Sequence, residues 1–375
     1  MSTKQVRASN FEWLRIIAMF MIVAHHYTHQ GQSGIDFGWD TDMLLVNRIL
    51  LRIFCNGGGI GNNLFLLIGG YFMVSKHTGA SKVIKLWSTV SFYSLACLIV
   101  TMLWGHPVGA KDILAGILPI PMELYWFAST YFLLLLVANF LNRFVQTVDR
   151  KQLGQLIGIM VIIKSVLPMV FIQMEISEFV WFVTVYLIAA YIRLYDNRLF
   201  CLPAKLYVWV AFPVLAVQIS LSVILEFVKK AIPGIEKNVM YFADTERLFV
   251  LVVSVSLFLM FKNMDIKHSA FVNKIAASTF AVYLIHNNPL LLRILWLDIF
   301  KTNEFVDEPW FILHMIGTIL CVYVVCTVID MLCARTVIPW VTRFYTFLWE
   351  KICAAASRIG AYSQRFFSKT LKGDL

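Results

Sequence analysis

Charged side chains are scarce in this sequence of 375 residues. Only 14% of the residues are Asp, Glu, Lys or Arg, whereas 59% are apolar; ordinary soluble domains carry about 25% charged residues. The mean hydropathy is +0.74. A soluble domain needs enough polar side chains to cover its surface, and a disordered chain needs more charge than this. The composition therefore excludes soluble, disordered and fibrous proteins and predicts a polytopic membrane protein.

The motifs of several common sites are also missing. The seven cysteines form no CxxC pair and only Cys55 is expected on the outer side, so neither a disulfide framework nor a zinc site is indicated. No P-loop, GxSxG, HExxH or dinucleotide-binding fingerprint occurs in a supporting context, and we expect no metal. The net charge of +10 is typical of the loops of a membrane protein and predicts no nucleic-acid partner.

Long apolar runs indicate how the chain crosses the membrane. They last about 17–22 residues and do not alternate, which excludes a β-barrel and predicts an all-α bundle. Twenty-one Lys and Arg residues fall in loops and a tail assigned to the inner side, against eight outside, so both termini are expected to be cytoplasmic. We expect ten transmembrane helices, over residues 11–28, 58–75, 84–104, 125–142, 154–172, 178–194, 206–226, 246–261, 276–297 and 310–333.

The chain divides into a transmembrane domain, residues 1–334, and a basic tail, residues 335–375. If Arg343–Lys372 is one helix, its Lys and Arg side chains share one sector of the surface. Its first turns carry the aromatic residues Trp340 and Phe344. This pattern predicts an amphipathic helix that lies on the anionic inner leaflet; a frayed basic tail is the alternative.

The first predicted span contains a basic residue and histidines. Arg15 and His26 are eleven residues apart. Eleven steps of 100° end about 20° past three turns, so both side chains project from one face, about 16 Å apart along the axis. His25 is turned away from that face. Charged groups inside spans are costly and mark sites by default, so this stripe predicts a polar path through the bilayer. The alternative is an Arg that reaches the headgroups and a His in the outer interface.

Polar residues also interrupt the ninth span. Tyr283, His286 and Arg293 share one face at helical spacing, and Pro289 frees a backbone carbonyl near His286. These groups either line a cavity or form a structural polar cluster. Lys164 in the fifth span and Asp330 in the tenth could pair or line the same cavity.

Further candidates lie near the two ends of the helices. Glycines at 57–61 and 69–70 of the second span indicate either tight helix packing or a narrow passage for an extended ligand. On the inner side, Lys82 and Lys85 face one way and could bind phosphates, or simply follow the positive-inside rule. On the outer side, Glu123 lies on the same side as His26 and could fix its tautomer; a salt bridge at the rim is the alternative.

Together these residues resemble the bacterial integral-membrane acyltransferase family 3, over essentially the whole chain. The mark of that family is a basic residue, ten residues and a His in the first span, and Arg15 and His26 match it. Its F-F-x-x-S-G-[FY] segment is similar to Leu64–Phe72, with Gly69 in place of the usual Ser. The basic residues that follow are Lys82 and Lys85 instead of arginines.

Two later segments carry the same resemblance. The family's Leu-Trp-Phe is similar to Tyr125-Trp126-Phe127, and its S-x-x-x-Y-L-x-H is similar to Thr279–His286. The resemblance is to the stand-alone form, without an extracytoplasmic SGNH-type domain.

The resemblance implies an O-acyltransferase of the bacterial inner membrane that uses cytoplasmic acyl-CoA, most simply acetyl-CoA. The acceptor would be a hydroxyl of a cell-surface or lipid-linked carbohydrate. His26, with Arg15 and Glu123, would be catalytic, as a general base or as the carrier of an acyl-imidazole. Lys82, Lys85, Tyr283 and His286 would bind the acyl donor.

Two other functions would also use a polar path through the membrane. A transporter or flippase for glycans or metabolites is the first, although no inverted repeat is evident. A non-catalytic sensor or substrate-binding module is the second. The transporter alternative does not account for Arg15 and His26 at the spacing that the family shows.

Overall fold

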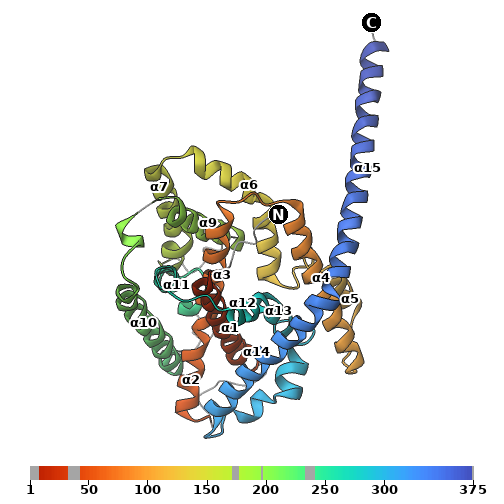
Figure 1. The fold of residues 1–375 in the computed structure, drawn as a ribbon. Coiled ribbons are helices and arrows are strands. Elements are labelled where there is room, and N and C mark those ends of the chain that lie inside the picture. The colour runs from red at the N-terminus through yellow and green to blue at the C-terminus, as the bar shows by residue number, and fades with distance from the viewer. Residues whose placement is uncertain (1–7, 33–42, 171–176, 196, 233–240, 374–375) are drawn as a thin grey trace.

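The computed structural model describes residues 8–32, 43–170, 177–195, 197–232 and 241–373, and the side chains of these residues except 170, 229–230 and 359–373. Within these ranges every regular element is a helix, as the all-α prediction requires (Figure 1). The α-helices are α1 (Ser9–His29), α2 (Leu45–Cys55), α3 (Gly57–Met73), α4 (Ala80–Leu103), α5 (Ala110–Ile117), α6 (Trp126–Thr147), α7 (Arg150–Val161), α8 (Leu167–Val170), α9 (Glu178–Leu194), α10 (Ala204–Ala231), α11 (Leu248–Lys262), α12 (Ala270–Ala277), α13 (Thr279–His286), α14 (Phe311–Thr336) and α15 (Ile338–Gly373).

Five helical stretches in the described part of the chain are long and apolar enough to cross a membrane. They are α4, α6, the stretch Arg150–Met169, α10 and α14. A sixth apolar stretch, Ala270–His286, is shorter. Each of the ten predicted spans overlaps a helix, but the number of crossings and the cytoplasmic termini remain predictions.

One predicted span is not a single helix. The ninth, 276–297, breaks at Ser278 and again after His286, and a π-helical segment begins at Ile294. Proline disfavours helical geometry in the residue before it and has no N–H to donate, so Pro289 ends the helix here. The Asn288 side chain accepts a hydrogen bond from the Leu290 N–H, 2.9 Å away, and closes the turn. The prediction that Arg293 continues the face of His286 is therefore wrong.

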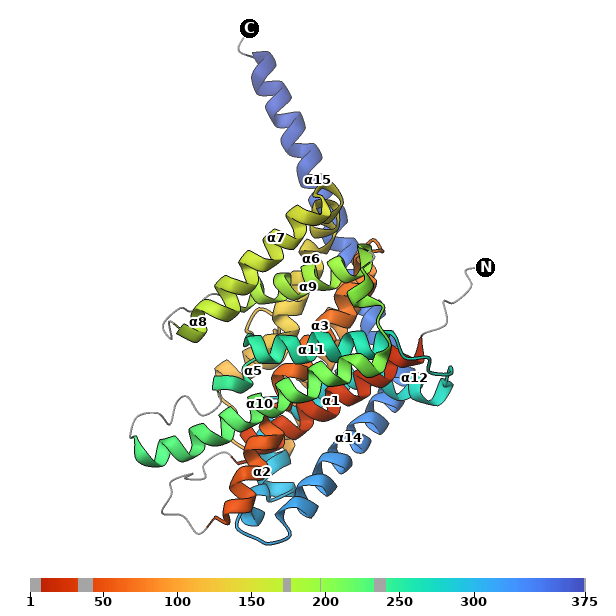
Figure 2. The same cartoon turned by 90° about the vertical axis from the view of Figure 1, so that its left-hand side faces the viewer.

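Helix α1 lies at the centre of the bundle, where α2, α3, α11, α12, α13 and α14 pack against it (Figures 1 and 2). Its apolar positions at helical spacing, Leu14, Ala18 and Tyr27, are fully buried. Because α1 contacts so many neighbours, a polar side chain on it is surrounded by protein and not by lipid.

Glycines of α3 allow that helix to approach α1 closely. A Cβ atom on Gly61 would lie 2.6 Å from the backbone oxygen of Ala18, and one on Gly58 would lie 2.5 Å from the His25 ring. Real Cβ atoms do not come this close to backbone oxygen. Of the two sequence interpretations, tight packing therefore applies at these two positions.

Three ion pairs, two of which share Glu226, hold neighbouring elements together. Arg48 and Arg52 of α2 bind the two carboxylate oxygens of Glu226 on α10, at 2.9 and 2.8 Å. Lys164 binds Glu246 at 2.7 Å, so the predicted pairing of Lys164 with Asp330 is wrong. Asp330 instead accepts a hydrogen bond from the Tyr93 hydroxyl at 2.6 Å. Buried charges need such partners because the protein interior solvates them poorly.

Helix α15 contains the predicted basic tail and projects beyond the bundle (Figures 1 and 2). Its first part packs along α4, where the Ser88 and Thr342 hydroxyls lie 3.0 Å apart. The basic side chains Arg365, Lys369 and Lys372 lie outside the described side chains. The predicted contact of this helix with the inner leaflet stays a prediction.

Candidate active site

Two buried histidines from distant parts of the chain meet in the bundle. His26, near the end of α1, and His286, the last residue of α13, join through Nδ1 and Nε2 at 2.8 Å. The other ring nitrogen of His286, Nδ1, lies 2.6 Å from the carbonyl oxygen of Val282. The packing of α13 against α1 brings these rings together.

The hydrogen bonds assign the proton positions of this pair. A carbonyl oxygen can only accept, so His286 Nδ1 carries a hydrogen and donates it to Val282. In a neutral His286 the Nε2 atom is then an acceptor, and His26 Nδ1 donates to it. His26 Nε2 is left with its lone pair, which is the state that a general base or a nucleophile requires.

A pocket of about 130 Å³, which we name the outer pocket after its predicted side of the membrane, surrounds His26. Many of the side chains that line it are polar or aromatic. They belong to α1, α3, α6, α13 and the segment before α11. They include His25, His26, Asn62, Trp126, Asp244 and Tyr283.

Asp244 is a residue of this pocket that the sequence did not single out. It accepts a hydrogen bond from Arg247 Nη2 at 3.0 Å, and the Arg247 guanidinium lies over the Tyr241 ring, 3.9 Å from its centroid. Partial burial raises the pKa of Asp244, and the Arg247 guanidinium offsets part of that rise. Nothing in the sequence around Asp244 distinguishes it from other acidic residues of the outer loops; only the packing of this segment beside α3 does.

Glu123, which was predicted to orient His26, does not occupy that place. It is exposed, has a positive φ of 52°, and precedes α6. The Nδ1 atom of His26 is hydrogen-bonded to His286. His286 therefore orients the ring, and Trp126, three residues after Glu123, is the part of this segment that lines the pocket.

The two adjacent histidines of α1 have different surroundings. His25 donates from Nδ1 to the carbonyl oxygen of Cys55 at 2.6 Å, and its ring is stacked on His29. Arg15, the other residue of the predicted stripe, forms an ion pair with Glu12 at 2.5 Å and interacts electrostatically with Tyr131. Arg15 thus faces protein groups and does not extend only to lipid headgroups.

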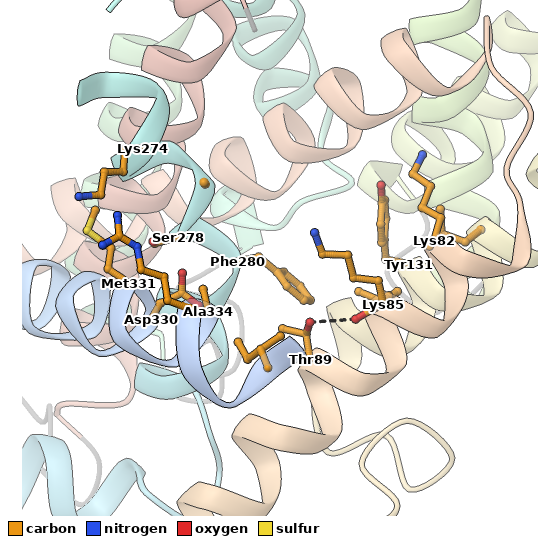
Figure 3. Close-up of a pocket in the computed structure, with 16 residues that line it drawn as sticks. Lys82, Lys85, Thr89, Tyr131, Lys274, Ser278, Phe280, Asp330, Met331 and Ala334 are labelled. Carbon is orange, nitrogen blue, oxygen red and sulfur yellow. Dashed lines mark hydrogen bonds between the residues drawn. The ribbon is translucent and has the colours of Figure 1, made fainter. Parts of the chain in front are cut away.

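A larger pocket of about 520 Å³, which we name the inner pocket after the predicted side of Lys82 and Lys85, is shown in Figure 3. It is lined by the predicted donor-binding residues Lys82 and Lys85 of α4. Lys274 of α12 and Arg335 of α14, which the sequence did not single out, line it as well. The N-cap of α12 positions Lys274: the Ser269 hydroxyl accepts from the Val272 N–H at 3.3 Å.

The inner and outer pockets approach each other along α13. Phe280 lines the inner pocket and Tyr283 lines the outer one. Their ring centroids are 6.3 Å apart, and three residues of helix rise only about 4.5 Å. Tyr283 and His286, predicted to bind the donor, thus lie with His26, one turn beyond the inner pocket.

A comparison with protein families matches an acyltransferase domain to residues 9–331. The match includes His26, Lys82, Lys85 and His286, and it extends from the first residues of α1 into α14. The chain belongs to acyltransferase family 3. Searches of the curated proteins and of the solved structures found no match.

The acyltransferase is a multi-pass membrane protein, since its apolar helices and its family agree. Its described residues contain no group of three or more His, Cys, Asp or Glu side chains placed to hold a metal ion. The groups that the arrangement does offer are an imidazole with a free ring nitrogen, a polar pocket beside it, and a cationic pocket one helical turn away.

Proposed function

We propose that the acyltransferase moves a short acyl group from cytoplasmic acyl-CoA to a hydroxyl of a cell-surface or lipid-linked carbohydrate. The observation that supports this most is the approach of the two pockets at Phe280 and Tyr283. A donor whose phosphates stay in the inner pocket could pass its slender pantetheine arm between these rings. Its thioester would then reach His26.

The inner pocket is suited to a ligand with several negative charges. Lys82, Lys85, Lys274 and Arg335 converge on one cavity, and cations so placed are suited to phosphate groups. The alternative for the two lysines of α4, that they only follow the positive-inside rule, does not require them to share a cavity with cations from two other helices.

The chemistry follows from the free Nε2 atom of His26. This nitrogen takes the proton of the acceptor hydroxyl while the hydroxyl oxygen attacks the thioester carbonyl. The tetrahedral intermediate then collapses, the carbon–sulfur bond breaks, and the CoA thiolate takes the proton back from His26. His286 accepts the Nδ1 hydrogen bond throughout and keeps the imidazole oriented.

A covalent route uses the same atoms. His26 Nε2 would attack the thioester carbonyl, the carbon–sulfur bond would break, and CoA would leave as its thiolate. The acceptor hydroxyl would then attack the acyl group on Nε2, the carbon–nitrogen bond would break, and the hydroxyl proton would pass to Nε2 and on to the thiolate. The two routes differ in one observable: only the covalent route releases CoA before any acceptor is added. A burst of free thiol without acceptor would select it.

The outer pocket supports a carbohydrate as the acceptor. Trp126 offers an aromatic face, and Asp244 and Asn62 offer groups that hydrogen-bond to hydroxyls. Small-molecule sites commonly combine such an aromatic surface with a few polar groups. We propose that the protein lies in the inner membrane of a bacterium. The His26 pocket would face away from the cytoplasm, because most Lys and Arg residues fall in loops assigned to the opposite, cytoplasmic side.

Analysis of cell-surface glycans tests the proposal. In a strain that lacks the gene, one ester should disappear while the amount of glycan stays the same. The unaltered gene should restore the ester and the variant His26→Ala should not. Loss of the whole glycan would instead indicate a transporter or flippase, which the family membership does not favour.

A further inference from the structure

The inner pocket carries its cations in two groups. Lys82 and Lys85 lie one turn apart on α4 and line one side. Figure 3 shows Lys274 of α12 on the other side of Phe280, near Asp330 and Ala334 of α14. Arg335 follows Ala334 directly and lines the same cavity.

The acidic side chains that the structure describes do not neutralise these cations. Within the described ranges, no ion pair joins Lys82, Lys85, Lys274 or Arg335 to a carboxylate. Asp330 is the acidic residue of the lining, and its Oδ1 atom is bonded to the Tyr93 hydroxyl at 2.6 Å. One carboxylate thus faces four cations, which favours a ligand with several negative charges.

We infer that Lys274 and Arg335 bind the 3′-phosphate of CoA, whereas Lys82 and Lys85 bind its diphosphate. The inference rests on the proposed function and assigns a subsite within it. CoA carries phosphate at two places, the diphosphate and the ribose 3′ position, and a pocket with two groups of cations matches this division.

The order of the two subsites follows from the path of the donor. The diphosphate is joined directly to pantetheine, so it must lie nearest the rings that lead to His26. In Figure 3, Lys85 lies between Phe280 and Tyr131. Lys274 lies beyond Phe280, on the side left for the ribose.

This assignment has a consequence for the choice of donor. A phosphopantetheine arm attached to a carrier protein has one phosphodiester and no 3′-phosphate. Lys274 and Arg335 would then have no partner, and the acyltransferase would prefer CoA thioesters to carrier-protein thioesters. A charge-assisted contact of this kind discriminates by about tenfold or more.

Direct binding tests the assignment. The purified full chain in detergent is titrated with CoA and with 3′-dephospho-CoA, which needs neither the acyl group nor the acceptor to be known. We expect the unaltered protein to bind CoA about tenfold or more tightly than 3′-dephospho-CoA. The double variant Lys274→Ala/Arg335→Ala should bind both ligands with the lower affinity, so that the ratio approaches one.

Three further variants provide the controls. Lys85→Ala should weaken both ligands by a similar factor and preserve their ratio, because both contain the diphosphate. Lys267→Ala removes an exposed cation of the inner loop that does not line the pocket, and it should change neither affinity. The double variant Lys274→Gln/Arg335→Gln removes the two charges but keeps side chains of similar size. Elution of each variant as a single species in size-exclusion chromatography shows that it is folded.

The outcomes separate the two proposals. Equal affinities in the unaltered protein, or an equal loss for both ligands in the Lys274 and Arg335 variants, would overturn the 3′-phosphate assignment and leave the acyl-CoA proposal standing. If neither ligand binds to the folded, unaltered protein, acyl-CoA is not the donor and the proposed function fails with it.

Discussion

At the scale of single residues, two neighbouring histidines show how surroundings set chemistry. His25 and His26 are adjacent in sequence, yet the ring of His25 is bonded to the Cys55 carbonyl, whereas His26 is held by His286. The 100° step between them directs one ring to α2 and the other to α13. Both rings donate from Nδ1 and keep the lone pair on Nε2; what differs is the partner, which is a backbone carbonyl for His25 and a second imidazole for His26.

We expect His26→Ala to abolish acyl transfer and His25→Ala to retain substantial activity. Removing a general base typically costs about 10²–10⁴-fold in rate. The measurement is the transfer rate in purified membranes, with protein amount and elution profile as controls for folding. Equal losses in the two variants would show that the helical phase selected the wrong ring.

His286 acts through His26 and is a positioning residue. We expect His286→Leu to lower kcat about 10–100-fold with little change in KM for either substrate, because the ring of His26 loses its partner. His286→Gln keeps an acceptor oxygen and should recover part of the rate. If Gln and Leu reduce kcat equally, or if the loss is entirely in KM, His286 does not orient His26.

At the scale of elements, close packing of α3 on α1 positions the outer pocket. Gly58 and Gly59 of α3 line this pocket, and Gly61 lies one turn further along, against the backbone of Ala18. The break after His286 serves the same site, because it ends α13 where the ring meets His26. The helix ends and the helix contacts therefore matter as much as the polar residues themselves.

We expect Gly61→Ala to destabilise the protein by about 1–3 kcal/mol, because a Cβ atom cannot fit 2.6 Å from the Ala18 oxygen without moving α3. The measurement is the midpoint of thermal unfolding in detergent. Gly158→Ala on α7 is the matched control, since nothing lies within 4 Å of its Cβ position. This control should be neutral or slightly stabilising; equal effects at both sites would contradict the packing argument.

At the scale of the whole molecule, the proposed reaction requires two pockets that open on opposite sides of the membrane. The cationic pocket contains Lys82 of the predicted inner side, and the His26 pocket contains Trp126 and Asp244 of the predicted outer side. A donor that stays in the cytoplasm can reach an outer acceptor only if these assignments hold.

We expect a single cysteine at Asn303 to react with an impermeant thiol reagent in intact cells. A cysteine at Ser81 should react only after the cells are opened. Both positions are exposed in the structure, so access depends on sidedness and not on burial. The background must lack the seven native cysteines. Labelling of Ser81→Cys in intact cells would overturn the topology and the cross-membrane mechanism with it.

Some residues of the candidate site could be predicted from the sequence, and others could not. Lys82 and Lys85 were recognisable because they are one turn apart on the same helix, but Lys274 and Arg335 join them only through the packing of α12 and α14. Glu123 was chosen as the partner of His26 from its expected side of the membrane, and the partner proved to be His286. Lys164 likewise pairs with Glu246 and not with Asp330.

The sequence by itself determined that this protein is an α-helical membrane protein, that it resembles an acyltransferase, and that His26 and His25 lie on different faces. These properties depend on composition and on geometry within one helix, which act over a few residues. The tertiary structure alone decided which helices meet. His26 and His286 are 260 residues apart, and their contact arises because α13 packs against α1 and ends at His286. Local periodicity carries no information about such pairings, so the tautomer of His26, the four cations of the inner pocket and the short distance between the pockets became visible only in the folded chain.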